Sequence, residues 1–471
     1  MRASIAIRAT LVAVLLLSSR SANAGPVVTF IGDVNFNGLG TDQSGLPSTL
    51  LEDGVSPQNG LNGFGSAIAY TGYSDRYVLL ADRGPNKFSY PGGAAVDNTT
   101  SYDNRYQIFD ISVVPDASSS TGYDVAASNV GTTLLKNSQG VQFQGISTGF
   151  STSPSVENHR LDSEGIRVAP DGTIYVSDEY GPYIYHFNQQ GQEIGQLTVP
   201  ASFEIANPGP NAAAEAANNS LGRVTNKGLE GIAISPDGKT LVAALQSPLI
   251  QDGGNASTND RLLVYDLTNP GVPPKEYLYQ LDSGLAISEI LAVNNHEFII
   301  DERDGTAGGG KKLLYEVDLN QSSAPTDLTN SAYAGTTTAN GLPKSGTPAG
   351  IVPLAKTLFA NIGQILIAAN PFVPGTGGLP DKIEGYAWGP TLPDGNELLL
   401  ATNDNDFSTS VTGGFPDYIF AFEVSGLNDF QAEQFPAGYT FPAPEPATLV
   451  IFLAGFLGLT VVRRRRTRAV Q

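Results

Sequence analysis

Short runs of alternating apolar and polar residues, separated by turns, fill the stretch 162–200 (DSEGIRVAPDGTIYVSDEYGPYIYHFNQQGQEIGQLTVP). This alternation is typical of β-strands. It predicts four of them, over residues 166–169, 173–177, 183–188 and 193–199. The turn Pro170-Asp171-Gly172 lies between the first two and favours a hairpin. Four antiparallel strands in about 40 residues form the unit of a β-propeller blade.

The same unit recurs along the chain. Two further copies keep the Pro-Asp-Gly turn, and their first strands follow Lys227 and Lys382. Weaker copies follow Gly63 and begin at Ile287. Each copy has a polar or acidic residue entering the first strand and an acidic or amide cluster leaving the second. We therefore predict an all-β protein with a β-propeller fold, because a blade cannot bury its faces alone and must stack against others.

Other elements follow from the same patterns. A strand at 27–31 is expected to complete the last blade and close the ring. Outer strands are predicted within 106–114 (YQIFDISVV), at 262–267 and at 313–319. A short helix is expected in the Ala- and Asn-rich insertion 206–219, and the best helix candidate is 354–367 (LAKTLFANIGQILI).

The N-terminus, Met1 to Ala24, has the three parts of a secretory signal peptide. Arg2 and Arg8 supply the basic start, an apolar run follows, and a small-x-small site ends it at Ala24. The apolar run over residues 9–17 is too short to span a bilayer. The sequence therefore predicts an exported protein.

The C-terminal segment 441–471 differs abruptly from the propeller segment, 25–440. Pro444-Glu445-Pro446 precedes an apolar run at 449–462, predicted as a short helix, and an arginine cluster at 463–468. This tail resembles a PEP-CTERM sorting signal of Gram-negative bacteria. The resemblance implies export across the inner membrane, transient membrane anchoring, cleavage by an exosortase, and a final location at the cell surface, outer envelope or extracellular matrix. A permanent tail anchor is the alternative, for which the apolar run is short.

Charge narrows the range of partners. The formal net charge is −20, and eight of the 26 basic residues lie at the two ends (three before Gly25 and five after Val462). This leaves 18 basic residues against 46 acidic ones. Nucleic acid is excluded as a partner, since binding to its phosphates needs a basic surface. Divalent cations suit such a chain. The absence of cysteine excludes disulfides and thiol chemistry.

Acidic residues recur at matching places in the repeats, and the first strand of a blade lines the central channel. Four glutamates are interpreted as equivalent: Glu164, Glu230, Glu289 and Glu384. Close carboxylates cannot all stay ionised without a counter-charge. A hard cation, Ca²⁺ before Mg²⁺, would supply it. A second tier is expected from Asp82, Asp178, Asp301 and Asp404. The alternative is an ion-pair network in which these acids pair with Arg83, Arg167, Arg303 and Lys382.

Several motifs resemble the phytase-like family, described as having esterase-like activity. They are LLADRGPN at 79–86, DSEGI at 162–166, SDEYGP at 177–182, NKGLEGIAISPDGKTLVAALQSPL at 226–249, KIEGYAWGP at 382–390 and NDNDF at 403–407. The resemblance implies a six-bladed propeller that hydrolyses phosphate or carboxylic esters. Five blades are readable, so the sixth is expected from 87–160 together with the N-terminal strand.

In a hydrolase of this kind, a bound cation would polarise the ester and activate water. Arg83, Arg167 and Arg303 could hold phosphate oxygens in bidentate fashion. A carboxylate or His159 could act as general base. The alternative is a non-catalytic propeller that binds ligands or polymers such as exopolysaccharide, which the sorting tail favours. Lactone hydrolysis is a third hypothesis.

Overall fold

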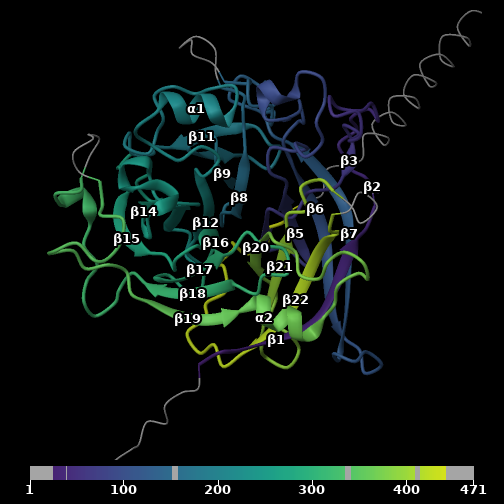
Figure 1. The fold of residues 1–471 in the computed structure, drawn as a ribbon. Coiled ribbons are helices and arrows are strands. Elements are labelled where there is room, and N and C mark those ends of the chain that lie inside the picture. The colour runs from purple at the N-terminus through teal and green to yellow at the C-terminus, as the bar shows by residue number, and fades with distance from the viewer. Residues whose placement is uncertain (1–24, 39, 151–157, 335–340, 409–413, 442–471) are drawn as a thin grey trace, which may run out of the picture.

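Five four-stranded antiparallel sheets surround a central axis in the computed structural model of the protein (Figure 1). The structure describes residues 25–38, 40–150, 158–334, 341–408 and 414–441. The predicted signal peptide and almost all of the predicted sorting tail lie outside these residues. None of the helices in the described ranges is long and apolar enough to cross a membrane.

Each sheet is one blade, and its strands run outward from the axis in chain order except in the last blade. Blade 1 contains β4 (Ala67–Tyr70), β5 (Arg76–Leu80), β6 (Arg105–Pro115) and β7 (Tyr123–Leu134). Blade 2 contains β8 (Ser163–Val168), β9 (Ile174–Asp178), β10 (Tyr183–Phe187) and β11 (Glu193–Leu197). Blade 3 contains β12 (Leu229–Ile234), β13 (Thr240–Leu245), β14 (Asn259–Asp266) and β15 (Lys275–Gln280). Blade 4 contains β16 (Ala286–Ala292), β17 (Glu297–Arg303), β18 (Lys312–Asp318) and β19 (Lys356–Asn361). Blade 5 contains β20 (Ile383–Trp388), β21 (Glu397–Asn403), β22 (Asp417–Ser425) and β1 (Val27–Phe36).

The N-terminal strand closes the ring, as the sequence predicts. β1 pairs antiparallel with β22 from Val27 opposite Ser425 to Phe36 opposite Asp417, and so becomes the outermost strand of blade 5. At the axis each inner strand contacts the next, and β20 returns to β4. The two ends of the folded chain are therefore joined in one sheet.

The prediction of six blades is wrong: the described residues form five. The region assigned to a sixth blade instead supplies β6 and β7, the long outer strands of blade 1. The N-terminal strand that was to share in it belongs to blade 5. A further blade would need its own inner strand, and residues 87–160 contribute none to the ring in the part of them that is described.

The insertion helix is confirmed as α1 (Ala212–Asn218), which starts where the Asn211 side chain accepts a hydrogen bond from the Ala214 amide. The predicted helix at 354–367 is half wrong. Its first part is strand β19, and α2 begins only at Ile362 and ends at Ala369. Asn361 explains the boundary, because its side chain caps the helix by accepting from the Gln364 amide. Residues 356–361 pair with β18 as the outer strand of blade 4. This pairing overrides their helical sequence pattern.

The inner strands pack so closely that glycine is required between them. A β-bulge interrupts β8, β12, β16 and β20 near their starts. Gly165, Gly231 and Gly385 lie at these bulges, directly after a glutamate. A Cβ on Gly231 would lie 2.6 Å from backbone atoms of Glu289 on β16, and one on Gly165 would lie 2.7 Å from the Glu230 carbonyl oxygen. The bulge also turns the preceding glutamate toward the channel.

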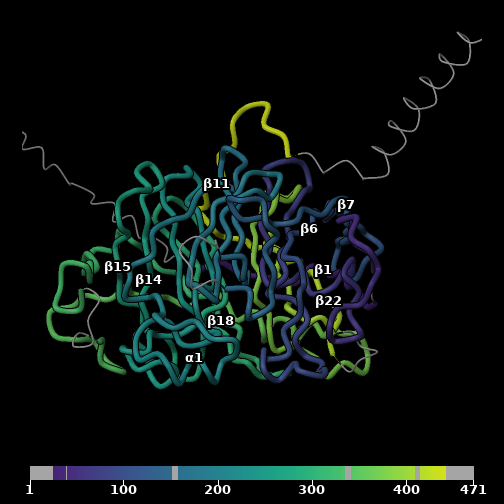
Figure 2. Tube along the Cα trace, turned by 90° about the horizontal axis from the view of Figure 1, so that it is seen from above, coloured from purple at the N-terminus to yellow at the C-terminus, as the bar shows by residue number. Residues whose placement is uncertain are grey.

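The channel has two mouths. The upper mouth is the end where the inner strands begin, and α1 lies on that side. The lower mouth is the end where the inner strands finish, and residues 427–441, which we call the C-terminal strap, cross it. Figure 2 shows these two sides: α1, on the side of the upper mouth, lies at the bottom of that view, and the yellow C-terminal loop, on the side of the lower mouth, lies at the top. Hydrogen bonds fix the strap to blades 4, 3 and 1, from Gln431 to Val293, from Gln434 to Pro236 and from Arg76 to Phe441.

Gly231→Ala tests the close packing of the inner strands. We expect it to lower the free energy of unfolding by about 1–3 kcal/mol, the usual cost of overpacking a core. Gly195→Ala on the edge strand β11 is the matched control, because no atom lies within 4 Å of the added Cβ. It should change stability by less than about 0.5 kcal/mol. Equal denaturant midpoints for the two variants would contradict the packing argument.

Candidate functional site

Strand register places two rings of side chains at the upper mouth. In each blade, one residue of the inner strand and its paired residue on the second strand fix the register. The first-ring residue lies two positions before the paired inner-strand residue. The second-ring residue lies three positions after the paired residue on the second strand. The first ring, in blade order, is Ser66, Glu164, Glu230, Ser288 and Glu384. The second ring is Asp82, Glu179, Gln246, Arg303 and Asp404.

The register corrects three predicted equivalences. Ile290 pairs with Ile300, so Ser288 and not Glu289 is the blade 4 counterpart of Glu164. Asp178 lies one residue before the second ring, and its carboxylate accepts the backbone N–H groups of Asp162, Tyr180 and Gly181. Asp301 lies two residues before that ring. A shift of one residue along a strand places the side chain on the other face of the sheet. Short acidic motifs that look alike in the sequence do not reveal such a shift.

Three carboxylates of blade 2 meet at the upper mouth. Asp162, Glu164 and Glu179 each offer one oxygen within 4.8 Å of the others. Asp162 is also bound by Arg83, at 2.9 Å from Nη1 to Oδ2. Glu179 is 1% exposed, and neither of its oxygens has a hydrogen-bond partner among the described residues. Glu164 is half-buried, so the group is accessible from the mouth. The arrangement is an acidic group with the ligand types that a hard cation binds.

Three of the other predicted metal ligands form salt bridges with basic side chains. Glu384 pairs with Arg303, Glu289 with Arg167, and Asp404 with Lys382. Asp82 accepts the Gly84 amide, and Asp301 is buried near Arg303 and Lys312 without a hydrogen bond to any described residue. The ion-pair alternative therefore describes Glu289, Glu384 and Asp404, whereas Glu164 and Glu230 have no such partner.

Burial and mutual repulsion hold carboxyl pKa values high at this mouth. Desolvation, and then the charges of Glu230, Asp162 and Glu179, keep the pKa of Glu164 well above its usual range. Desolvation, followed by the negative charge of Glu230, also holds the pKa of Glu179 well above its usual range. Desolvation and then Glu384 raise the pKa of Glu230 to about 8, although Arg303 opposes the shift. These shifts favour the protonated form of the carboxyl groups unless a cation neutralises the site.

A cavity of about 240 Å³ opens beside Glu230, between blades 3 and 4. Lys227 and Arg303 bring positive charge to its wall, and Ser247, Asn255 and Ser257 bring polar groups. Gln246 also lines it and donates a 2.7 Å hydrogen bond to Glu230. The cavity thus has a wall with positively charged side chains next to a carboxyl group with a raised pKa.

The predicted catalytic residues are separated. Arg83 and Arg303 lie at the mouth, in ion pairs. Arg167 lies deeper in the channel, where its guanidinium donates to the carbonyls of Ile68, Ile166, Ile290 and Tyr386, and is 3% exposed. His159 lies before β8, and none of the described interactions joins its imidazole to the acidic group. The predicted catalytic and metal-binding residues, chosen because they recur between blades, do not include Asp162, Glu179 or Lys227. The four acids within DSEG and SDEY of a single blade were the available signal.

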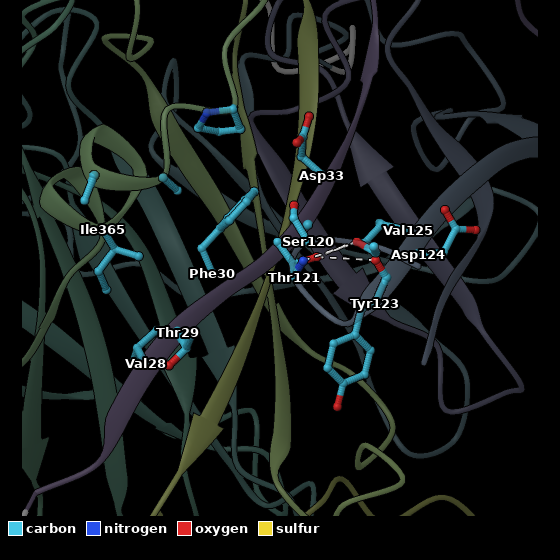
Figure 3. Close-up of a pocket in the computed structure, with 15 residues that line it drawn as sticks. Val28, Thr29, Phe30, Asp33, Ser120, Thr121, Tyr123, Asp124, Val125 and Ile365 are labelled. Atoms are coloured by element: carbon cyan, nitrogen blue, oxygen red, sulfur yellow. Dashed lines mark hydrogen bonds between the residues drawn. The ribbon is translucent and has the colours of Figure 1, made fainter. Parts of the chain in front are cut away.

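A larger hollow than the cavity beside Glu230 lies elsewhere in the described residues. Its volume is about 790 Å³, and it is formed by β1, the β6–β7 hairpin and α2 on the outer side of the ring. Figure 3 shows Phe30 between Ile365 and the hairpin residues Thr121 and Tyr123. Its lining includes Asp33 and Asp124 but no basic side chain. It therefore lacks the clustered carboxylates and cations of the upper mouth.

One family profile matches most of the chain. The profile of the phytase-like family, described as "Esterase-like activity of phytase", matches residues 59–407. The chain belongs to the phytase-like family. The matched range starts before blade 1 and ends after the second strand of blade 5, so it contains both rings of the upper mouth.

Individual proteins that this phytase-like chain resembles include one curated protein and several solved structures. Over 258 residues the chain is 31% identical to an "Uncharacterized secreted protein" of Arthroderma benhamiae. The matched region covers 47% of this chain and 50% of that protein. The chain thus spans about half the length of this curated relative. A PQQ-bound aldose sugar dehydrogenase from Streptomyces coelicolor is 14% identical with a TM-score of 0.31, over 85% of this chain and 98% of that one. The calcium-binding protein regucalcin from Agrobacterium tumefaciens is 13% identical with a TM-score of 0.33, over 83% and 98%.

The raised carboxyl pKa values predict how stability depends on pH. Between the unfolded pKa of about 4.5 and the folded pKa of about 8, native Glu230 binds more protons than unfolded Glu230. Stability in chelator should therefore fall as pH rises through this window. Glu230→Gln should make the fall in melting temperature between pH 5 and pH 8 shallower. The exposed control Glu52→Gln should leave the fall in melting temperature between pH 5 and pH 8 unchanged. If Glu230→Gln also left this fall unchanged, the raised pKa of Glu230 would be refuted.

Proposed function

We propose that this phytase-like propeller is a metal-dependent hydrolase of phosphate or carboxylic esters, with a divalent cation held by Asp162, Glu164 and Glu179. One observation carries the proposal: the Glu179 carboxylate is buried with both oxygens unpartnered among the described residues. A buried charge without a partner is costly, and a bound cation removes the cost.

The donor set fits the cation. Three carboxylates supply hard oxygen ligands, and Ca²⁺ accepts mixed and flexible geometry more readily than Mg²⁺. Carboxylates at the mouth outnumber the basic groups that face them, which are Arg83, Lys227, Arg303 and Lys382. A cation would balance part of this excess and would keep Glu164 and Glu179 ionised at neutral pH.

The residues around the group supply the other parts of a hydrolytic site. A cation held there supplies Lewis-acid polarisation of the ester and a more acidic bound water. Lys227 and Arg303 on the cavity wall bind the anionic part of the substrate. Glu230 is protonated near neutral pH and can give its proton to the leaving group. Gln246 orients Glu230 through their hydrogen bond.

A non-catalytic binding propeller is the second candidate. The observation that favours it is that Arg83, Arg167 and Arg303 are all engaged by carboxylates of the protein itself. In that case the cation would stabilise blade 2, and a polymer such as exopolysaccharide would bind across the mouth without turnover.

We also propose that the chain is exported and sorted through its tail. The N-terminal 24 residues and the tripartite segment after Phe441 support this on sequence grounds. The curated relative's description as secreted agrees with export. An exosortase acting near Pro444-Glu445-Pro446 would release the propeller at the envelope of a Gram-negative cell.

Calcium dependence tests the proposed function. We expect wild-type protein to bind Ca²⁺ by calorimetry and to hydrolyse 4-nitrophenyl phosphate or 4-nitrophenyl acetate, with turnover lost in chelator. Glu179→Gln removes the unpartnered charge and should weaken Ca²⁺ binding at least tenfold and abolish turnover. Glu52→Gln should do neither. Calcium binding without turnover of either ester would favour the binding propeller, and no calcium binding would refute both.

Lys227→Gln tests the anion-binding wall. It removes one positive charge from the cavity and leaves the acidic group in place, so KM for an anionic ester should rise roughly tenfold, the effect of about 1.4 kcal/mol. The change in kcat should be smaller. Lys239→Gln is the matched control, since that side chain is 64% exposed at the turn between β12 and β13. An unchanged KM for Lys227→Gln would place substrate elsewhere.

A further inference from the structure

A second cavity, of about 330 Å³, lies at the lower mouth of the channel, at the opposite end from the acidic group. Its inner wall is made by residues at or just beyond the ends of inner strands, which include Tyr70, Ala292 and Trp388. Its outer wall is the C-terminal strap from Phe430 to Phe435. Phe430, Glu433 and Phe435 are only half-buried, so the cavity can be reached from solvent.

Aromatic rings surround this space, and each is held in place. The Trp388 indole N–H donates to the Ala292 carbonyl at 2.8 Å, and its ring meets Phe430 edge-on with centroids 5.1 Å apart. The Tyr70 hydroxyl donates to the Ser74 carbonyl. Phe435 stacks on Tyr439 with centroids 4.8 Å apart and lies over Gly72, where a Cβ would be 2.1 Å from its ring. Only glycine leaves room for the Phe435 ring.

One carboxylate belongs to the lining of the aromatic cavity. Glu433 lines it, and its Oε2 is buried with no hydrogen bond to any described residue. The basic group whose charge acts on Glu433 is Arg167, whose guanidinium is 3.0 Å from Glu289 and donates to the Ile290 carbonyl. The Arg167 guanidinium therefore already pairs with Glu289 and donates hydrogen bonds to four backbone carbonyls. Asp75 adds negative charge beside Tyr70.

We propose that the lower mouth is a binding site for a small organic cation, an alkylammonium or guanidinium group. Aromatic faces attract such cations through their ring quadrupoles, more strongly where water is excluded. The Glu433 carboxylate in the lining supplies the opposite charge. A cavity of this size suits a ligand of a few to about ten heavy atoms. The upper mouth differs in kind, because it has carboxylates without aromatic rings among its two rings of side chains.

Calorimetric titration of the full chain with choline, propylammonium and methylguanidinium tests the site. At least one should bind, and the neutral choline isostere 3,3-dimethyl-1-butanol should bind at least tenfold more weakly than choline. Glu433→Gln should weaken cation binding at least tenfold, and Phe430→Leu several-fold because it keeps an apolar side chain but removes the π face. Both should leave Ca²⁺ binding at the upper mouth unchanged, which shows that the propeller is intact.

Three results would overturn the proposal. The first is no binding of any of the three cations at millimolar concentration. The second is equal binding of choline and its neutral isostere, which would make the cavity a plain apolar or carbohydrate-type pocket. The third is undiminished binding by Glu433→Gln in a protein that melts at the wild-type temperature. The exposed control Glu52→Gln should bind the cations like wild type.

Discussion

The hydrogen bonding of Arg167 at the propeller axis constrains much of the structure around it. In a ring of five blades the inner strands approach so closely that glycines are needed at their bulges, and backbone carbonyls face the narrow channel. Arg167 donates to carbonyls of four of the five inner strands and pairs with Glu289. A guanidinium has enough donors to satisfy several such carbonyls at once, which a single water or a lysine would do less completely. The blades are thus linked at the centre as well as at the rim.

This arrangement divides the channel chemically. Above Arg167, carboxylates and cations from all five blades form the two rings of the upper mouth, where desolvation and like charges keep carboxyl pKa values high. Below it, aromatic residues and the strap form a cavity with Glu433 in its lining. Because the guanidinium and its partners lie between the two mouths, the mouths are chemically separate. The metal-dependent hydrolase proposed for the upper mouth and the organic-cation site at the lower mouth rest on separate groups of residues.

The acidic group also illustrates how a repeat fold acquires a site. Equivalent positions in the five blades carry glutamate, serine, glutamine, arginine and aspartate, so the ring is chemically asymmetric. Blades 4 and 5 use Arg303, Glu384, Lys382 and Asp404 in ion pairs. Blade 2 places three acids together, and of these Asp162 pairs with Arg83, which follows a strand of blade 1. The acidic group therefore arises where the repeats differ.

Local pattern in the sequence determined the β-propeller, the recurrence of its blades, the closing strand β1 and the acidic character of the channel mouth, since two-residue alternation and Pro-Asp-Gly turns are local signals. It could not determine that residues 87–160 complete blade 1, because strand partners far apart in the chain are chosen by pairing in space. Nor could it tell Ser288 from Glu289, or Glu179 from Asp178, because a bulge shifts the register by one residue and reverses the face. Tertiary structure alone decided which carboxylates are neutralised by arginine and lysine and which remain unpartnered.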